Sequence, residues 1–281
     1  MNILTWIAIA SLYKLNPDEN KHLKDHCGAK HLDVTEGLGF ASTGVAVPPN
    51  KYPFTAAIAR SRGSRCTGSL ISNRHVLTAA HCVYDLSQII NFTANTCNPI
   101  GRLLPLPDIT IYLGTKCPKP GECPSGEKRT PYKPRYVISH PEFATCFSAA
   151  NDIAVIELDE DVNSEEASPI CMPEEDDMLR YGTVTSIGYG YDARNRPDKA
   201  EPGLQEVNLT ITQYVRGKFV ARGYEKAICQ IISDEKMPPA HFTDVRLYLR
   251  WICDITGVCP LRTTKFPSPV KDGKVWAQRA A

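Results

Sequence analysis

The sequence predicts an all-β protein, and three observations support this. Apolar and polar residues alternate from Leu204 to Gln213, as in a strand with one buried face. Between Cys66 and Cys82, apolar and alternating residues form two further strand patterns, joined by a turn at Ser72-Asn73. The 281-residue chain is long enough to bury one large β core or two smaller ones.

The composition indicates a disulfide-bonded, secreted protein. The chain has 11 cysteines together with 22 prolines and 18 glycines, which is unusual for a reduced cytosolic protein. The odd number leaves at least one thiol unpaired within the chain. The net charge of +1 argues against nucleic acid or an anionic membrane surface as the main partner.

The first 13 residues contain an apolar run, Ile3–Leu12, that suits the core of a signal peptide and is too short to span a bilayer. No Lys or Arg precedes the run, so a truncated or mispredicted start is an alternative interpretation.

A short helix is predicted to follow. Asn16 is a capping residue, Pro17 suits the first helical position, and Asp18 and Glu19 face the positive end of the helix dipole. The helix is expected to end near Cys27-Gly28.

The string Thr78–Cys82, Thr-Ala-Ala-His-Cys, places a histidine beside a cysteine at the end of an apolar run. Together with Cys66–Ser72 upstream, it resembles the histidine motif of trypsin-like serine proteases. The resemblance implies two six-stranded antiparallel β-barrels with a C-terminal helix. It also implies a Cys66–Cys82 disulfide and a general-base role for His81. The alternative is a structural histidine on a strand-to-helix turn.

The segment Asn151–Leu158, Asn-Asp-Ile-Ala-Val-Ile-Glu-Leu, resembles the aspartate motif of the same family. Asp152 would then accept a hydrogen bond from the second ring nitrogen of His81 and fix its tautomer. An Asx turn that caps the strand is the alternative.

The segment before the barrels resembles the leader of nematode trypsin-like proteins, in which an acidic stretch runs into Cys-Gly. By this resemblance residues 14–40 form a leader or pro-region, which Cys27 tethers to Cys171. Ala41–Gly44 stand where active members carry Ile-Val-Gly-Gly, and Phe40 stands at the cleavage position, so a trypsin-like activator could not cut there.

Two glycosylation sequons begin at Asn91 and Asn208 and suit a secreted protein. The first barrel is expected at residues 41–165, including a cysteine-rich loop insertion between Cys97 and Cys146.

The family pattern breaks near the C-terminus. In active members a cysteine and one more residue lead into Gly-Asp-Ser-Gly-Gly-Pro, whose glycines allow the turn that forms the oxyanion hole. Here Cys229-Gln230 leads into Ile231-Ile232-Ser233. Ser233 has the spacing of the nucleophile. The favoured alternative takes Ile231–Ser233 as a later strand, with the intervening block deleted.

The deletion agrees with the cysteine number, because it would remove the partner of Cys229. The remaining cysteines allow fifteen pairings, which stay open: Cys97, Cys117, Cys123, Cys146, Cys253 and Cys259. The second barrel and the helix are expected at residues 166–259, with the barrel incomplete, and a disordered tail at 260–281.

The leading hypothesis is a secreted protease homologue that retains His81 and Asp152, lacks a competent nucleophile and acts by binding proteins. The alternative is an active endopeptidase with Ser233 as nucleophile. Ala227 stands where trypsins have the aspartate that selects Lys or Arg, so trypsin-like specificity is not expected. No cofactor and no metal are predicted. A weaker interpretation of His75, His81 and Cys82 as metal ligands lacks a fourth ligand at suitable spacing.

Overall fold

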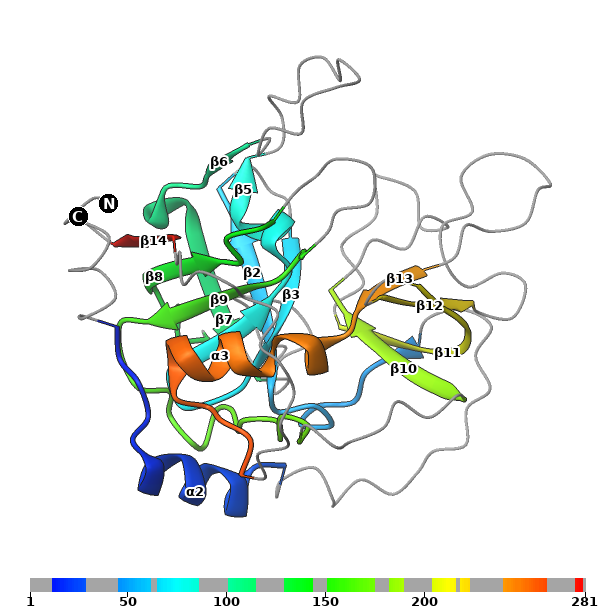
Figure 1. Ribbon diagram of the computed structural model, residues 1–281, viewed down its shortest axis with the longest axis horizontal. Coiled ribbons are helices and arrows are strands. Elements are labelled where there is room, and N and C mark those ends of the chain that lie inside the picture. The colour runs from blue at the N-terminus through cyan, green and yellow to red at the C-terminus, as the bar shows by residue number, and fades with distance from the viewer. Residues whose placement is uncertain are drawn as a thin grey trace.

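The prediction of an all-β fold is confirmed by the computed structural model, which has two curled antiparallel sheets and a short C-terminal helix (Figure 1). The structure describes residues 12–28, 45–61, 65–85, 101–114, 129–143, 151–174, 182–189, 204–215, 218–222, 240–261 and 276–279.

The first sheet has seven strands among the described residues, and six of them surround one core. The hydrogen-bonded order of these six is β8-β9-β4-β3-β2-β7, and an antiparallel bridge between Ile111 and Tyr132 links β7 to the residues just before β8. The sheet therefore closes on itself, as predicted for the first barrel. Its strands are β2 (Thr55–Arg60), β3 (Arg65–Leu70), β4 (His75–Thr78), β7 (Ile109–Leu113), β8 (Pro134–Ser139) and β9 (Ala154–Leu158).

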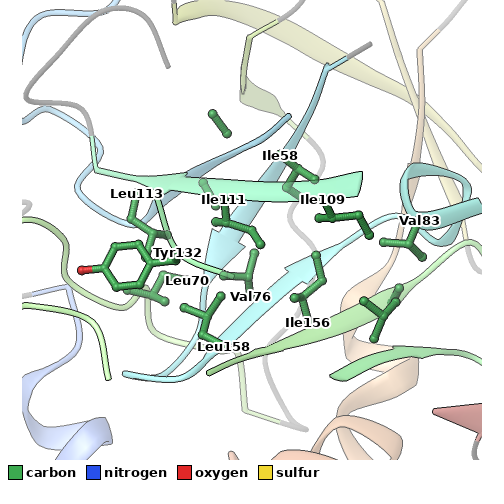
Figure 2. Packing of buried hydrophobic residues seen from close by; sticks show 14 of the residues in the cluster. Ile58, Leu70, Val76, Val83, Ile109, Ile111, Leu113, Tyr132, Ile156 and Leu158 are labelled. Carbon is green, nitrogen blue, oxygen red and sulfur yellow. The ribbon is translucent and has the colours of Figure 1, made fainter. Parts of the chain in front are cut away.

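Branched apolar side chains from facing strands fill this barrel (Figure 2). Ile58 from β2, Ile111 from β7 and Ile156 from β9 are completely buried. The alternation along β7, where Ile109, Ile111 and Leu113 are buried and the residues between them are partly exposed, is the pattern of a strand with one face in a core.

The second sheet has five strands among the described residues. They are β1 (Val45–Ala46), β10 (Thr183–Gly188), β11 (Gln205–Val215), β12 (Lys218–Arg222) and β13 (Ala240–Thr243). The long strand β11 pairs with β10, β12 and β1. The resemblance implied six strands for this barrel in the family and an incomplete barrel in this chain, and the residues between Arg222 and Ala240 lie outside the described residues. Val45–Ala46, assigned from the sequence to the first barrel, pair with this second sheet instead.

Among the described residues, two α-helices lie outside the sheets. Helix α2 (Pro17–His26) has Asn16 as its cap, with reciprocal hydrogen bonds between Asn16 and Glu19. Helix α3 (Leu249–Thr256) ends at Gly257 in the left-handed conformation. Shorter elements are η2 (Ala80–Val83), η3 (Leu106–Asp108), η4 (Val245–Tyr248) and the pair β5 (Tyr84–Asp85) and β6 (Arg102–Leu103).

The apolar face of α3 packs against the outside of the first sheet. Trp251, Ile252 and Ile255 share a second buried cluster with Ile138 of β8 and Val155 of β9. In the view of Figure 1, α3 lies below β8 and β9, and α2 lies further down at the lower left. No helix among the described residues has the length and apolar character needed to cross a membrane.

The C-terminal tail differs from the prediction of disorder at one place. Trp276–Arg279 form strand β14, which pairs antiparallel with β8 from Tyr136 to Ser139. A strand edge left with free N–H and C=O groups accepts another segment in this way.

Candidate active site

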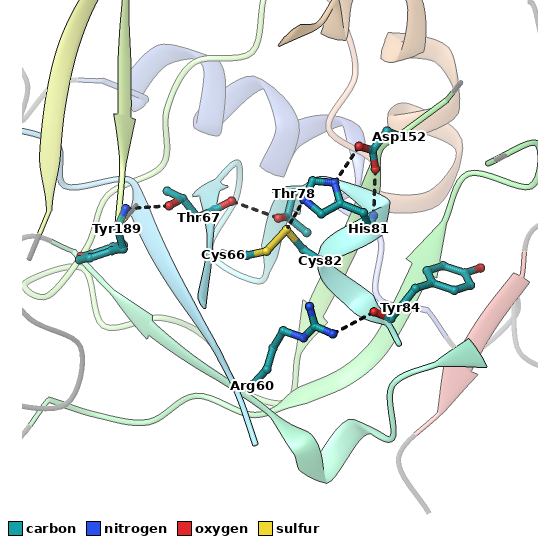
Figure 3. Close-up of a disulfide and its surroundings, with 9 residues drawn as sticks. All are labelled: Arg60, Cys66, Thr67, Thr78, His81, Cys82, Tyr84, Asp152 and Tyr189. Carbon is teal, nitrogen blue, oxygen red and sulfur yellow. Dashed lines mark hydrogen bonds and ion pairs between the residues drawn. A yellow bond between two sulfur atoms is a disulfide. The ribbon is translucent and has the colours of Figure 1, made fainter. Parts of the chain in front are cut away.

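His81 lies on η2, directly after β4. The neighbouring Cys82 forms a disulfide with Cys66 of β3 (Figure 3). Thr78 at the end of β4 donates a hydrogen bond to the backbone carbonyl of Thr67, 3.1 Å away. The residues on both sides of His81 are therefore fixed to β3.

Asp152 lies just before β9, at a corner formed by Asn151. Asn151 has φ 53°, a left-handed conformation that asparagine tolerates better than most residues. Its side-chain amide donates to the carbonyl of Glu142 (3.0 Å) and its side-chain oxygen accepts from the hydroxyl of Tyr248 (3.0 Å). The corner is thus held to the start of α3.

The two side chains meet through two hydrogen bonds. The Nδ1–H of His81 donates to Oδ2 of Asp152 at 2.7 Å, and the backbone N–H of His81 donates to Oδ1 at 2.9 Å. Because the carboxylate can only accept, Nδ1 carries the proton and Nε2 of the neutral ring has a free lone pair. This nitrogen lies 3.5 Å from Sγ of Cys82.

The surroundings keep Asp152 ionised. Burial by itself would raise the pKa of this carboxyl, but the two hydrogen bonds from His81, the positive charge of the His81 ring when it is protonated, and the charge of Lys218 lower it below its ordinary value. The Asp152 side chain is 15% exposed and the His81 side chain 50% exposed. The pair therefore consists of a held carboxylate and an imidazole that is accessible to a bound molecule.

Only part of the predicted triad falls within the described residues. The structure brings His81 and Asp152 together, whereas Ser233 and the surrounding Cys229–Lys236 segment lie outside the described residues, as does the sequon at Asn91. Asn208 is exposed on β11, and its side-chain oxygen accepts a hydrogen bond from Thr185.

Three disulfides are present among the described residues. Cys27 is bonded to Cys171, and Cys66 to Cys82. Cys253 and Cys259 are bonded to each other across the end of α3. The sequence alone left this pairing open, as one part of the fifteen possible pairings of six cysteines.

The arrangement does not favour a metal site. Ligand atoms of Cys66, His81 and Cys82 lie within 4.8 Å of one another, but the two sulfurs are bonded together, so neither is a thiolate. His75 instead accepts a hydrogen bond from Ser72.

Sequence reasoning missed the residues that hold the aspartate in place. Asn151 was taken only as part of a motif, and Tyr248 was not considered for the site, although its hydroxyl fixes Asn151. The asparagine directly before the aspartate was a usable signal, because this residue type suits a left-handed corner. Nothing in the sequence around Tyr248 indicated its partner.

The two sheets, the C-terminal helix and the histidine held by an aspartate define the trypsin-type class of protein. A model of the trypsin family matches residues 42–237, more than half of the chain. The chain therefore belongs to the trypsin family of serine proteases.

Curated relatives agree with this assignment. The chain is 27% identical over 216 residues to the proclotting enzyme of Tachypleus tridentatus, covering 73% of this chain and 50% of the relative. It is 30% identical over 161 residues to the cercarial protease of Schistosoma mansoni, covering 56% of this chain and 55% of the relative. It is 28% identical over 200 residues to the venom serine protease Bi-VSP of Bombus ignitus, covering 66% of this chain and 47% of the relative. The chain thus spans about half the length of these relatives.

Solved structures show the same fold. The structure of GrC superposes with a TM-score of 0.52 at 20% identity, covering 74% of this chain and 96% of GrC. The structure of HL collagenase gives a TM-score of 0.51 at 19% identity, covering 76% and 97%.

Proposed function

We propose that this chain is a secreted, non-hydrolytic member of the trypsin family that acts by binding other proteins. One observation carries the proposal: the sequence has no glycine from Tyr224 to Thr256, where the family places its glycine-rich serine turn. Ile231 and Ile232 precede Ser233, and β-branched residues strongly disfavour the positive φ values that glycine adopts freely. Without that turn, the backbone amides that stabilise the oxyanion are lost together with the nucleophile.

A second candidate is an active endopeptidase, and the geometry of His81 favours it. Nδ1 is engaged by Asp152, so Nε2 is oriented as a base. In this case the Oγ of Ser233 would attack the peptide carbonyl while His81 takes its proton and later transfers it to the leaving amine. Because residue 227 is alanine, this position has no carboxylate that could select substrates with Lys or Arg beside the cleaved bond.

Labelling by a fluorophosphonate probe distinguishes the two candidates. We expect the wild-type chain to be labelled no faster than Ser233→Ala and at least about 10²-fold more slowly than active trypsin, because loss of an oxyanion-hole donor alone costs about 10²- to 10³-fold. His81→Ala is the matched control for the base. Label on Ser233 that disappears in His81→Ala would refute the non-hydrolytic proposal and support the endopeptidase.

Secretion is supported by the three disulfides, which persist in oxidising compartments. The named relatives include a venom protease, and the acidic leader running into Cys27-Gly28 supports placement in the nematode-type branch. Partners are proteins or peptides. The leader, two barrels and tail remain proposed domains at residues 14–40, 41–165, 166–259 and 260–281. A signal peptide was expected at residues 1–13, but Leu12 is buried and the backbone of Tyr13 bonds to the first sheet, so we propose that the signal peptide ends before Leu12 and that Leu12 and Tyr13 belong to the leader.

Glycosylation of Asn208 is a direct test of secretion. When the chain is expressed in a secreting eukaryotic cell, we expect peptide:N-glycosidase treatment to reduce its mass, and Asn208→Gln to lose one glycan, because Asn208 is exposed in an intact sequon. Gel mobility and intact mass give the result, and Asn163→Gln, which alters an asparagine outside any sequon, is the control. An Asn208→Gln chain with unchanged glycan mass contradicts the prediction.

A further inference from the structure

A buried polar pair lies on the first sheet, apart from His81 and Asp152. His75 of β4 and Glu157 of β9 are directly opposite each other across the two strands, and they are 1% and 0% exposed. Apolar residues of the second cluster surround them on this face, among them Ile71, Tyr136 and Val155. Buried polar groups of this kind are costly unless they are hydrogen-bonded.

The partners of this pair are main-chain groups of one residue in the leader, residues 12–28. The backbone N–H of Tyr13 donates to Oε2 of Glu157 at 3.0 Å, and the backbone carbonyl of Tyr13 accepts from Nε2 of His75 at 3.2 Å. Ser72 donates to the other ring nitrogen of His75 at 2.7 Å, which fixes the tautomer that can donate to Tyr13. The pair thus binds the main chain of Tyr13, whose ring also stacks on His75 with centroids 6.0 Å apart. The other carboxylate oxygen of Glu157 lies 3.4 Å from the guanidinium of Arg135.

The next leader residues contact the end of α3. The backbone N–H of Leu15 donates to the carbonyl of Thr256 at 2.9 Å. A Cβ on Gly257 would lie 2.2 Å from the carbonyl oxygen of Leu15, so only glycine admits the leader at this distance. The buried side chain of Asn20 forms two hydrogen bonds with the backbone of Cys259, at 3.0 and 3.1 Å.

We propose that His75, Glu157 and the turn Thr256–Cys259 form a docking site, and that its occupant is the leader segment Leu12–Asn20, which is non-helical up to Asn16 and continues into the first turn of α2. Docking of this segment joins the end of α3 to the first sheet. It does so independently of the Cys27–Cys171 disulfide, which lies seven residues beyond Asn20 and fixes only the far end of the leader. The inference does not depend on whether the chain hydrolyses peptides.

Hydrogen exchange on the full chain tests the α3 part of the site. Asn20→Ala removes both bonds to Cys259, whereas Lys21→Ala changes an exposed neighbour in the same helix. Alanine favours helix more than asparagine does, so weakened docking in Asn20→Ala could not arise from a weaker α2. We expect exchange in peptides covering residues 12–20 and 253–261 to be about 10- to 100-fold faster in Asn20→Ala, since two buried hydrogen bonds are lost. Lys21→Ala should match the wild type.

A second pair of variants tests the main-chain contact. The variant Glu157→Gln keeps a side-chain oxygen that can accept a hydrogen bond from the N–H of Tyr13, whereas Glu157→Leu has no acceptor there. We therefore expect Glu157→Gln to retain slow exchange in residues 12–20 and Glu157→Leu to lose it, with circular dichroism and melting checking that both fold. Equal protection in the two variants would overturn the proposed role of Glu157.

The tether is tested with the double variant Cys27→Ala, Cys171→Ala. Slow exchange in residues 12–20 of this variant supports docking without the disulfide. Fast exchange in residues 12–20 of the double variant would overturn the proposal. So would a result in which Asn20→Ala speeds exchange in the leader but leaves exchange in residues 253–261 unchanged. Fluorophosphonate labelling is read separately, so the outcome for the nucleophile does not affect this result.

Discussion

Replacing Trp251 with alanine is expected to lower the free energy of unfolding by about 3–5 kcal/mol, the usual cost of removing a large buried aromatic side chain. Trp251 is buried on α3 among residues of the first sheet, and its ring centroid lies 5.3 Å from that of His140. Urea unfolding followed by circular dichroism measures the change. The loss would be large because the cavity opens between the helix and the sheet.

Two control variants make this prediction specific. Leu247→Ala alters a residue that is 45% exposed just before α3, and it should change stability by no more than about 0.5 kcal/mol. Trp251→Phe keeps an aromatic ring and removes an indole N–H that has no hydrogen-bond partner among the described residues, so it should cost much less than alanine. If Trp251→Ala were as mild as Leu247→Ala, α3 would not be packed on the first sheet as described.

Acidification is the second change with a large expected effect. Burial lowers the pKa of His75 to about 3, although its hydrogen bond to Tyr13 acts in the opposite direction. Burial lowers the pKa of His140 to about 4. His140 lies between the rings of Tyr248 and Trp251, and its Nδ1 accepts a hydrogen bond from the backbone N–H of Glu142. Both histidines are therefore held neutral in the folded chain.

The direction of the effect follows from proton uptake. In the unfolded chain these histidines bind protons as the pH falls below about 6.5, and in the folded chain they do so only near pH 3 to 4. Stability is thus full above about pH 6.5 and falls on acidification. For His75, whose pKa falls from 6.5 to about 3, the loss approaches about 5 kcal/mol below pH 3. Glu157, whose pKa burial raises, opposes part of this loss because its folded form takes up a proton earlier.

Urea unfolding at pH 7, 6, 5 and 4 tests this prediction. His75→Gln and His140→Gln should each reduce the dependence of stability on pH, while His26→Gln, at an exposed position in α2, should leave it unchanged. Stability that stays constant or rises between pH 7 and pH 5 would contradict neutral burial of the two histidines.

Much of the first sheet could be predicted from the sequence because its signals are local. The alternation along strands, the capping residues Asn16 and Glu19, and the string around His81 each involve residues within a few positions of one another. The resemblance of that string to a known family also supplied the Cys66 and Cys27 pairings that occur in the structure. The second sheet was harder to predict, since its strand number depends on the segment where the family pattern breaks.

The all-β class, the trypsin-type motifs around His81 and Asp152, and the absence of glycine from Tyr224 to Thr256 could all be read from the chain without its fold. Tertiary structure alone decided that Tyr13 docks on His75 and Glu157, that Asn20 bonds Cys259, and that Trp276–Arg279 pair with β8. The physical reason is the range of the interactions. A cap or a strand pattern follows from neighbouring residues, whereas Tyr13 and Glu157 are 144 residues apart, and their hydrogen bond exists only because two packed surfaces bring them together.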